Sequence, residues 1–201
     1  MSIDRIDRLI PTPYLKTFLR AALDEMGSYT LQMMFRQAEI EPIEVDQITT
    51  GNIREVKASD FASLQASVRE YYGQGARGLL TRIGQTSWYK ATYQSLPGLR
   101  LWRMWSKILP RDERMKQILE RLAILMRGKD GRVAVHLLDV DLYLVDHSSD
   151  ATFHQAANEP ICWVTLGMIQ GAVVWATGKE FDVEEISCRA MGVESCRFRL
   201  R

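Results

Sequence analysis

An uncharged stretch, residues 161–178, constrains this chain more than any other part of its sequence. It reads ICWVTLGMIQGAVVWATG and contains Gly167 and Gly171 at the four-residue spacing of paired transmembrane helices. Such a stretch must leave water, either in a bilayer or in the centre of a folded core. It is at the lower limit of spanning length, contains Gln170 and lacks a cluster of positive charges at its flank. We therefore predict a helix buried in a globular core and no membrane span.

The hydrophobic periodicity divides the chain into an N-terminal helical part, residues 1–130, and a mixed part, residues 131–201. Apolar side chains recur at three- and four-residue intervals through the first part, and the alternation typical of strands begins after Gly131. Two strand-like runs are followed by the uncharged helix and by a terminal hairpin about Gly192. This order predicts an α+β fold, in which an antiparallel four-stranded sheet carries packed helices and is preceded by N-terminal helices. We expect one compact unit.

Two smaller features of the helical part have their own predictions. Residues 41–57 contain Pro42 and Gly51 and are predicted as a connector that holds a short strand. Residues 73–78, GQGARG, match the GxGxxG pattern of dinucleotide sites, but they follow helical sequence instead of a strand. We therefore exclude a nucleotide site there.

Charge and cysteine content limit the partners and the compartment. The 201 residues carry 26 Lys and Arg against 25 Asp and Glu, so the net charge of +1 indicates neither nucleic acid nor an anionic membrane as the main partner. Only a local basic patch could indicate such a partner. The N-terminal residues lack the apolar core of a secretory signal, so we expect a cytoplasmic protein with reduced thiols. A chain of this length buries enough surface to fold without disulfides. Its cysteines therefore need another explanation.

The three cysteines, Cys162, Cys188 and Cys196, all lie in the last forty residues. If the terminal hairpin pivots on Gly192, Cys188 and Cys196 oppose each other across the strands. Cys162 begins the uncharged helix, where the helix dipole favours a thiolate. With Glu185, three residues before Cys188, the set offers three sulfurs and one oxygen, which suit tetrahedral zinc.

Alternatives to this zinc site remain open at this point. A straight strand would send Glu185 and Cys188 to opposite faces, so the site requires a bend or bulge near Ile186 and Ser187. Glu184 is a rival ligand. A cross-strand disulfide, or three small buried apolar side chains without a metal, would explain the same cysteines.

The C-terminal residues resemble the signature of the 4-vinyl-reductase domain. Cys162 precedes a helix with Gly167 and Gly171, and residues 183–198 read VEEISCRAMGVESCRF. The family pattern has a cysteine before a glycine-containing helix, then a glutamate, a cysteine, an Ala-x-Gly turn, and a last cysteine followed by an aromatic residue. In phenol- and xylene-sensing activators with such a domain, the four side chains bind structural zinc. The resemblance implies these zinc ligands here: Cys162, Glu185, Cys188 and Cys196.

The same resemblance implies a fold and several functions. The fold is that of TRAPP vesicle-tethering subunits and of NO-signalling and Golgi-transport ligand-binding domains, in which helices and a sheet enclose a hydrophobic cavity and N-terminal helices often dimerise. Family members include sensors of small aromatics and stand-alone proteins linked to reduction of the 4-vinyl group in bacteriochlorophyll synthesis. We expect a zinc-stabilised protein that binds a hydrophobic or aromatic ligand as sensor, carrier or accessory protein. A 4-vinyl reductase or its accessory subunit, and a vesicle-tethering scaffold, are the alternatives.

The chain offers many aromatic side chains to a flat ligand such as a tetrapyrrole or a fatty acyl group. Core packing explains most of them equally well, but a ligand cavity also needs aromatic walls and a few polar anchors. The candidate ligand-binding residues are Trp88, Tyr89, Tyr93, Trp102, Trp105, His136, Tyr143 and Trp163. We find no fingerprint of a hydride-carrying cofactor, which argues against an autonomous reductase, and we assign no catalytic residue.

Two further surfaces are suggested by the pattern. Five basic residues fall within fifteen positions and are explained by a solvated helix face, or by contact with tetrapyrrole carboxylates, anionic lipid or a protein partner: Arg100, Arg103, Lys107, Arg111 and Arg114. Apolar stripes in the first forty residues predict a homodimer through the N-terminal helices, although burial within one chain explains the same stripes. These stripes contain Tyr14, Leu15, Phe18, Leu31, Met34 and Phe35.

Overall fold

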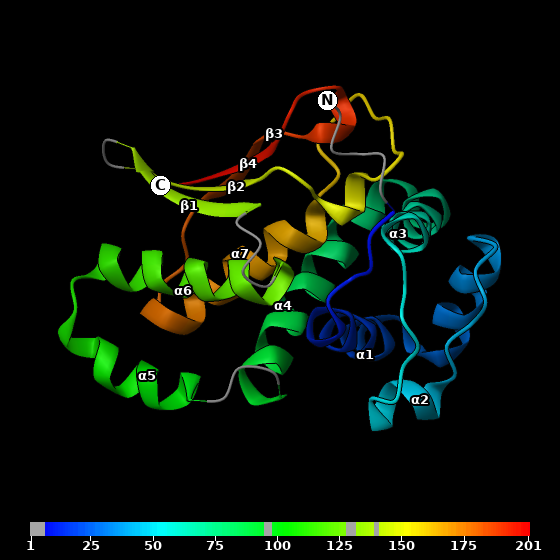
Figure 1. The fold of residues 1–201 in the computed structure, drawn as a ribbon, viewed down its shortest axis with the longest axis horizontal. Helices are drawn as coiled ribbons and strands as arrows, with labels where there is room; N and C mark the ends of the chain where they lie inside the picture. Colours follow the sequence, from blue (N-terminus) through cyan, green and yellow to red (C-terminus); the bar gives the residue numbers. More distant parts are fainter. Residues whose placement is uncertain (1–6, 95–97, 128–131, 139–140) are drawn as a thin grey trace.

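The computed structural model describes residues 7–94, 98–127, 132–138 and 141–201. Figure 1 shows a four-stranded antiparallel sheet above helices α6 (Arg111–Arg127) and α7 (Trp163–Thr177), with α1 to α3 gathered at one end of the molecule. The predicted α+β class, with helices packed on an antiparallel sheet, is confirmed. The predicted boundary between the two parts, at residues 130 and 131, lies outside the described residues. The helices of the N-terminal part are α1 (Thr12–Gln37), α2 (Val45–Thr50), α3 (Ala58–Tyr72), α4 (Ala76–Gln94) and α5 (Leu99–Trp105).

Helix α1 is bent at Gly27, whose backbone angles, φ 77° and ψ 165°, lie outside the helical region. Only glycine adopts this conformation without steric cost, so the residue separates two helical halves. The apolar stripes of both halves face the core of the same chain. Their six side chains are at most 3% exposed: Tyr14, Leu15, Phe18, Leu31, Met34 and Phe35. Intrachain burial, the alternative to a dimer interface, therefore accounts for these stripes.

The connector at residues 41–57 contains helix α2 where a short strand was predicted. Glu44 and Gln47 form a capping box that satisfies backbone groups at the start of α2, and Gly51 ends the helix in the left-handed conformation, with φ 80°. Lys57, at the end of the connector, forms one isolated β-bridge with Leu9. The prediction of a strand was wrong. Pro42 and Gly51 indicated a connector, but they did not indicate the capping box that starts a helix within it.

The sheet has the strand order β1-β2-β4-β3 and is antiparallel throughout. Its strands are β1 (Val133–Leu138), β2 (Asp141–Asp146), β3 (Val183–Ser187) and β4 (Cys196–Leu200). Alternate side chains of β2 and β4 are buried, among them Leu144 and Phe198, and they face α6 and α7. The opposite face, which carries Tyr143 and Arg199, is not covered by helices (Figure 1).

Helix α7 is the uncharged segment, and it lies in the middle of the fold. Eleven of its residues are buried, because it packs against α4, α6 and the sheet. Gly84 of α4 and Gly167 of α7 form the closest approach: a Cβ on Gly84 would lie 2.1 Å from the carbonyl oxygen of Val164. In the described part of the chain, we find no helix long and apolar enough to cross a membrane. The small-residue spacing thus serves helix packing within the core.

Candidate metal centre

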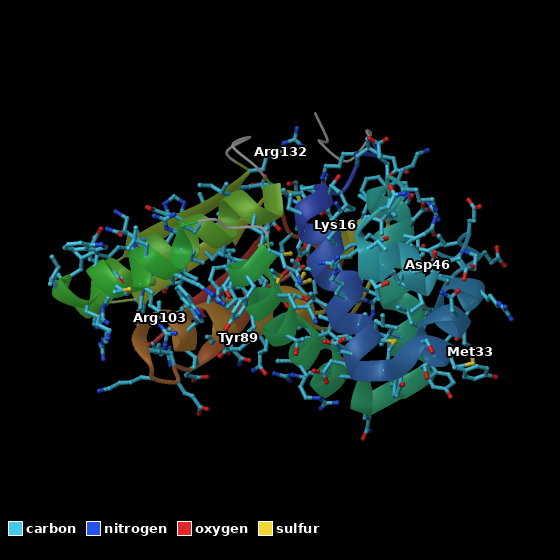
Figure 2. All side chains as sticks on the ribbon, turned by 90° about the horizontal axis from the view of Figure 1, so that it is seen from below. Lys16, Met33, Asp46, Tyr89, Arg103 and Arg132 are labelled. Atoms are coloured by element: carbon cyan, nitrogen blue, oxygen red, sulfur yellow. The ribbon has the colours of Figure 1, made fainter. Side chains whose placement is uncertain are left out.

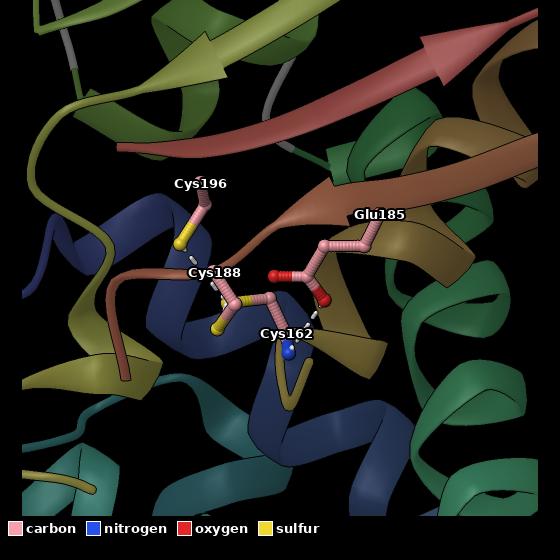
Figure 3. Close-up of side chains that lie close together, drawn as sticks. All are labelled: Cys162, Glu185, Cys188 and Cys196. Carbon is pink, nitrogen blue, oxygen red and sulfur yellow. Dashed lines mark hydrogen bonds between the residues drawn. The ribbon is translucent and has the colours of Figure 1, made fainter. Parts of the chain in front are cut away.

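Three chain segments bring the predicted zinc ligands together. Cys162 is the N-cap of α7, Glu185 lies in β3, Cys188 follows the end of β3, and Cys196 begins β4. A short 3-10 helix, Arg189–Met191, and the left-handed Gly192 turn the chain from β3 back into β4. Figure 3 shows the three sulfur atoms and the Glu185 carboxylate pointing toward one another.

A β-bulge makes this convergence possible. Glu185 pairs with Phe198 and Ser187 pairs with Arg197, so Ile186 is an extra residue between the two pairs. The register shift turns Cys188 to the same face as Glu185, whereas an unbroken strand would have separated them. The bulge that the sequence required at this position is present. Glu184 points to the outer face, where Arg199 binds it at 2.7 Å.

The spacing of the donor atoms fits a tetrahedral metal site. The Sγ atom of Cys162 lies 3.8 Å from that of Cys188 and 3.4 Å from that of Cys196, and all four ligand atoms lie within 4.8 Å of one another. A zinc ion with sulfur ligands at about 2.3 Å has tetrahedral edges of about 3.8 Å. All three cysteines are free and buried, and their sulfur atoms already lie at distances that suit a bound cation.

The carboxylate of Glu185 has one satisfied and one unsatisfied oxygen. The backbone N–H of Cys162 donates to Oε2 at 3.0 Å. The other oxygen, Oε1, is buried and has no hydrogen-bond partner in the part of the chain that the structure describes. A buried acceptor without a partner costs free energy. A cation bound by Oε1 would explain why this oxygen has no hydrogen-bond partner.

Burial and hydrogen bonding set the protonation of the cluster. Burial raises the pKa of the Cys162 thiol well above its ordinary value and raises the pKa of Glu185 to about 8. Hydrogen bonds from the Cys162 and Cys196 thiols lower the pKa of Cys188 to about 2. Burial thus opposes a negative charge on Cys162 and Glu185, and a divalent cation would bind as their protons leave.

Further contacts hold the sulfur atoms in place. The backbone N–H of Arg189 donates to the Sγ atom of Cys196 at 3.3 Å, and the Ser149 hydroxyl lies 3.4 Å from the Sγ atom of Cys162. Arg69 of α3 donates to the Gln155 side chain at 3.0 Å. Burial lowers the pKa of Arg69, and the nearby Cys162 and Cys188 oppose this shift. No motif in the sequence indicates Arg69, because it precedes the first cysteine by more than ninety positions.

A buried ion cluster supports the segment that leads to Cys162. Arg127 at the end of α6 donates to the Asp150 carboxylate and, at 2.6 Å, to the carbonyl of Ser148. Asp146 at the end of β2 lies 3.7 Å from Arg127, and Arg8 binds Asp150 at 2.7 Å. This cluster could not be predicted from the sequence, because its members come from four segments that no motif connects.

The candidate ligand-binding residues occupy separate places and do not form one cavity. Trp88 is fully buried and packs edge-to-face on Trp175 at 6.3 Å, while Trp102 stacks on Trp175 with nearly parallel rings. Tyr89, Tyr93 and Trp105 are exposed at the surface. His136 and Tyr143 are cross-strand partners on the uncovered face of the sheet, so they point away from the helices.

Trp163 alone among these residues lies beside the metal centre. It lines an open groove of about 820 Å³ between the α3–α4 connection, the start of α7 and β3. Apolar and charged side chains share the lining, and Glu185 belongs to both the groove and the cysteine cluster. The lining includes Gly73, Arg77, Glu159, Trp163, Leu166 and Val183. The glycine-rich segment 73–78 therefore shapes a groove wall between two helices, without the strand that a dinucleotide site requires.

Fold and site together define an α+β domain with a buried cluster of three cysteines and one glutamate at the junction of a helix and a hairpin. Residues 148–201, which contain the whole cluster, match the family model of the 4-vinyl-reductase domain. This match confirms the resemblance that the sequence signature predicted, over the C-terminal residues of the chain. A search of curated proteins finds no match.

Solved structures with a similar fold cover nearly the whole chain. An H-NOX protein variant from K. algicida, in the unliganded Fe(II) form, superposes with a TM-score of 0.59 at 15% identity and covers 95% of both chains. An H-NOX protein from S. oneidensis in the Fe(II)NO state gives 0.57 at 12% identity, over 94% of this chain and 97% of that chain. The phenol-responsive sensory domain of the activator PoxR, with phenol, gives 0.51 at 17% identity, over 83% and 87%. At these identities the likeness establishes a shared fold.

Proposed function

We propose that this chain is a zinc-stabilised protein that binds a small hydrophobic or aromatic molecule and acts as a sensor, carrier or accessory protein. The convergence of Cys162, Glu185, Cys188 and Cys196 within 4.8 Å carries the proposal. Three thiolates and one carboxylate fill a tetrahedral zinc site, so the bound metal supplies folding free energy and leaves no open position for a substrate. Cys162 would tie the start of α7 to the hairpin that holds the other ligands.

The groove beside the cluster is the binding site we propose. Its volume lies within the range of small-molecule sites. Trp163 and Leu166 offer flat and apolar contacts, and Arg77 offers a positive charge for a carboxylate. Because Glu185 lines the groove and belongs to the cluster, a ligand there would contact the element that the zinc holds in place. This arrangement suits a protein in which a ligand bound in the groove changes the position of the β3–β4 hairpin.

Tryptophan fluorescence tests the groove. We expect a flat hydrophobic ligand, such as a protoporphyrin or a fatty acid with a fluorescent aromatic tag, to quench Trp163. The variant Trp163→Ala should bind about fivefold more weakly, since an aromatic contact of this kind contributes about 1 kcal/mol. Trp105→Ala is the matched control, because Trp105 is 70% exposed and lies outside the groove. Equal loss in both variants, or no response in the unmodified protein, would count against the groove.

Compartment and assembly complete the proposal. We place the protein in the cytoplasm, where the three free cysteines stay reduced and available to a metal. The homodimer through the N-terminal helices stays a prediction, and the burial of the α1 stripes within one chain removes the apolar surface on which it depended. Sedimentation velocity of the full chain decides between monomer and dimer.

A further inference from the structure

Helix α5 and the 3-10 helix η3 (Ser106–Ile108) carry three different stripes of side chains. One stripe packs on the protein and contains Leu99, Trp102 and Ser106. The second is apolar, faces outward and follows the i, i+3, i+4, i+7 spacing of one helix face: Leu101, Met104, Trp105 and Ile108. The third is basic and lies between the other two: Arg100, Arg103 and Lys107.

The apolar stripe is the part of this segment most open to solvent. Leu101 is 59% exposed, Met104 69% and Ile108 84%. Tyr93, at 68% exposed, extends the same surface from the end of α4. Figure 1 places α5 at the edge of the molecule, on the far side of α6 from the sheet, and Figure 2 shows Arg103 and Tyr89 on the half of the molecule away from Met33 and Asp46. An exposed apolar row of this size marks an interaction surface.

The charged residues in the stretch of sequence that contains this row have one sign. Residues 71–111 contain seven Lys and Arg and no Asp or Glu. Within the described ranges, Arg82 and Lys90 pair with acidic residues of α1, but Arg100, Arg103 and Lys107 form no ion pair. The guanidinium groups of Arg100 and Arg103 lie over the rings of Tyr93 and Trp175, at 3.9 and 4.9 Å. With Lys107 they border a hollow of about 340 Å³.

We propose that the α5–η3 surface binds the headgroups and the acyl boundary of an anionic membrane surface. The segment would lie in the plane of the interface, with Leu101, Met104 and Ile108 below the headgroups. Arg100, Arg103 and Lys107 would meet lipid phosphates along one flank. Trp105 and Tyr93 have the amphipathic rings that prefer this depth. The protein would thus attach to a bilayer through one edge.

Other partners fit the surface less well. In a symmetric dimer the same patch meets itself, so the three cations would face the three cations of the second copy at short range. A nucleic acid would neutralise the charges and stack on Trp105, but it would leave the aliphatic side chains of the outer stripe exposed to water. Anionic lipid satisfies both the charge and the apolar row.

Vesicle co-sedimentation with the full chain tests the proposal. We expect the protein to pellet with phosphatidylcholine vesicles that contain phosphatidylglycerol, and to pellet much less with phosphatidylcholine alone or in high salt. Lys107→Ala should lower the partition coefficient about fivefold, the effect of one cation near an anionic surface. Ile108→Ser should lower it severalfold through lost apolar insertion.

Two exposed residues elsewhere provide matched controls. Arg36→Ala removes one exposed cation from α1, and Tyr29→Ser removes a side chain that is 82% exposed, comparable with Ile108. Both controls should bind vesicles like the unmodified protein, and thermal melts should show all four variants folded. Binding that ignores lipid charge, or equal loss in the controls, would overturn the proposal. Failure to pellet, with Ile108→Ser dissociating a dimer in sedimentation velocity, would overturn it too and assign the patch to a second copy.

Discussion

Alanine at Gly84 should separate the two helices that form the centre of the fold. A Cβ atom there would lie 2.1 Å from the carbonyl oxygen of Val164 and 2.9 Å from the backbone nitrogen of Met168, both on α7. Neither atom belongs to a flexible side chain, so α4 and α7 must move apart by about 1 Å to restore van der Waals distance. Overpacking of this kind costs about 1–3 kcal/mol. We expect a cost at the upper end of this range or above it, because the atoms that clash belong to the helix backbone. The higher helix propensity of alanine relative to glycine offsets this cost by about 1 kcal/mol.

We therefore expect Gly84→Ala to lower the free energy of unfolding by about 2–3 kcal/mol, measured by urea denaturation. Gly78→Ala on the same helix is the matched control, because its Cβ would meet only the end of the Arg82 side chain, at 3.8 Å. That substitution should raise stability by up to about 1 kcal/mol.

A double-mutant cycle strengthens the test. A Cβ on Gly167 would lie 2.0 Å from the carbonyl oxygen of Thr81, at the same crossing. One displacement relieves both clashes, so Gly84→Ala and Gly167→Ala together should cost clearly less than the sum of their separate effects. A Gly84→Ala protein as stable as the Gly78→Ala control would refute the close approach of α4 and α7.

Two further outcomes follow from the buried clusters and the site. Arg127→Met should lower the free energy of unfolding by about 3–5 kcal/mol in urea denaturation, because it leaves Asp146 buried without its cation and Asp150 with Arg8 alone; a loss below about 1 kcal/mol would show that water reaches these carboxylates. The isolated protein should not reduce the vinyl group of a divinyl tetrapyrrole with NADPH, because a filled zinc site has no redox chemistry and no open position; a spectral change with turnover would contradict the carrier and sensor proposal.

Local sequence signals predicted the order of elements in the C-terminal part, residues 131–201. The change of period after Gly131, the uncharged helix and the terminal hairpin are each set by residues close together in the chain, and the structure has strands, helix and hairpin in that order. The bulge at Ile186 was predictable because Glu185 and Cys188 could not share a face without it. Such inferences succeed when one segment determines the geometry.

Features built from distant segments were not predictable in the same way. Arg69 of α3 binds Gln155, and Arg127 joins carboxylates from β2 and the following loop, through side-chain directions that no local pattern specifies. The aromatic residues illustrate the same limit: their composition suggested one cavity, but helix packing buries Trp88 and exposes Trp105. Composition alone does not determine which way each ring points.

The bound metal is the most direct test of the account. Elemental analysis of freshly purified full chain, kept reduced, should find one zinc ion per chain. Glu185→Gln and Cys188→Ser should each lose the metal, and Cys188→Ser should lower stability by several kcal/mol. Glu184→Gln should retain it, since Glu184 faces the opposite side of the sheet and binds Arg199. A protein free of zinc, or Glu184→Gln and Glu185→Gln variants with equal metal content, would contradict the central claim.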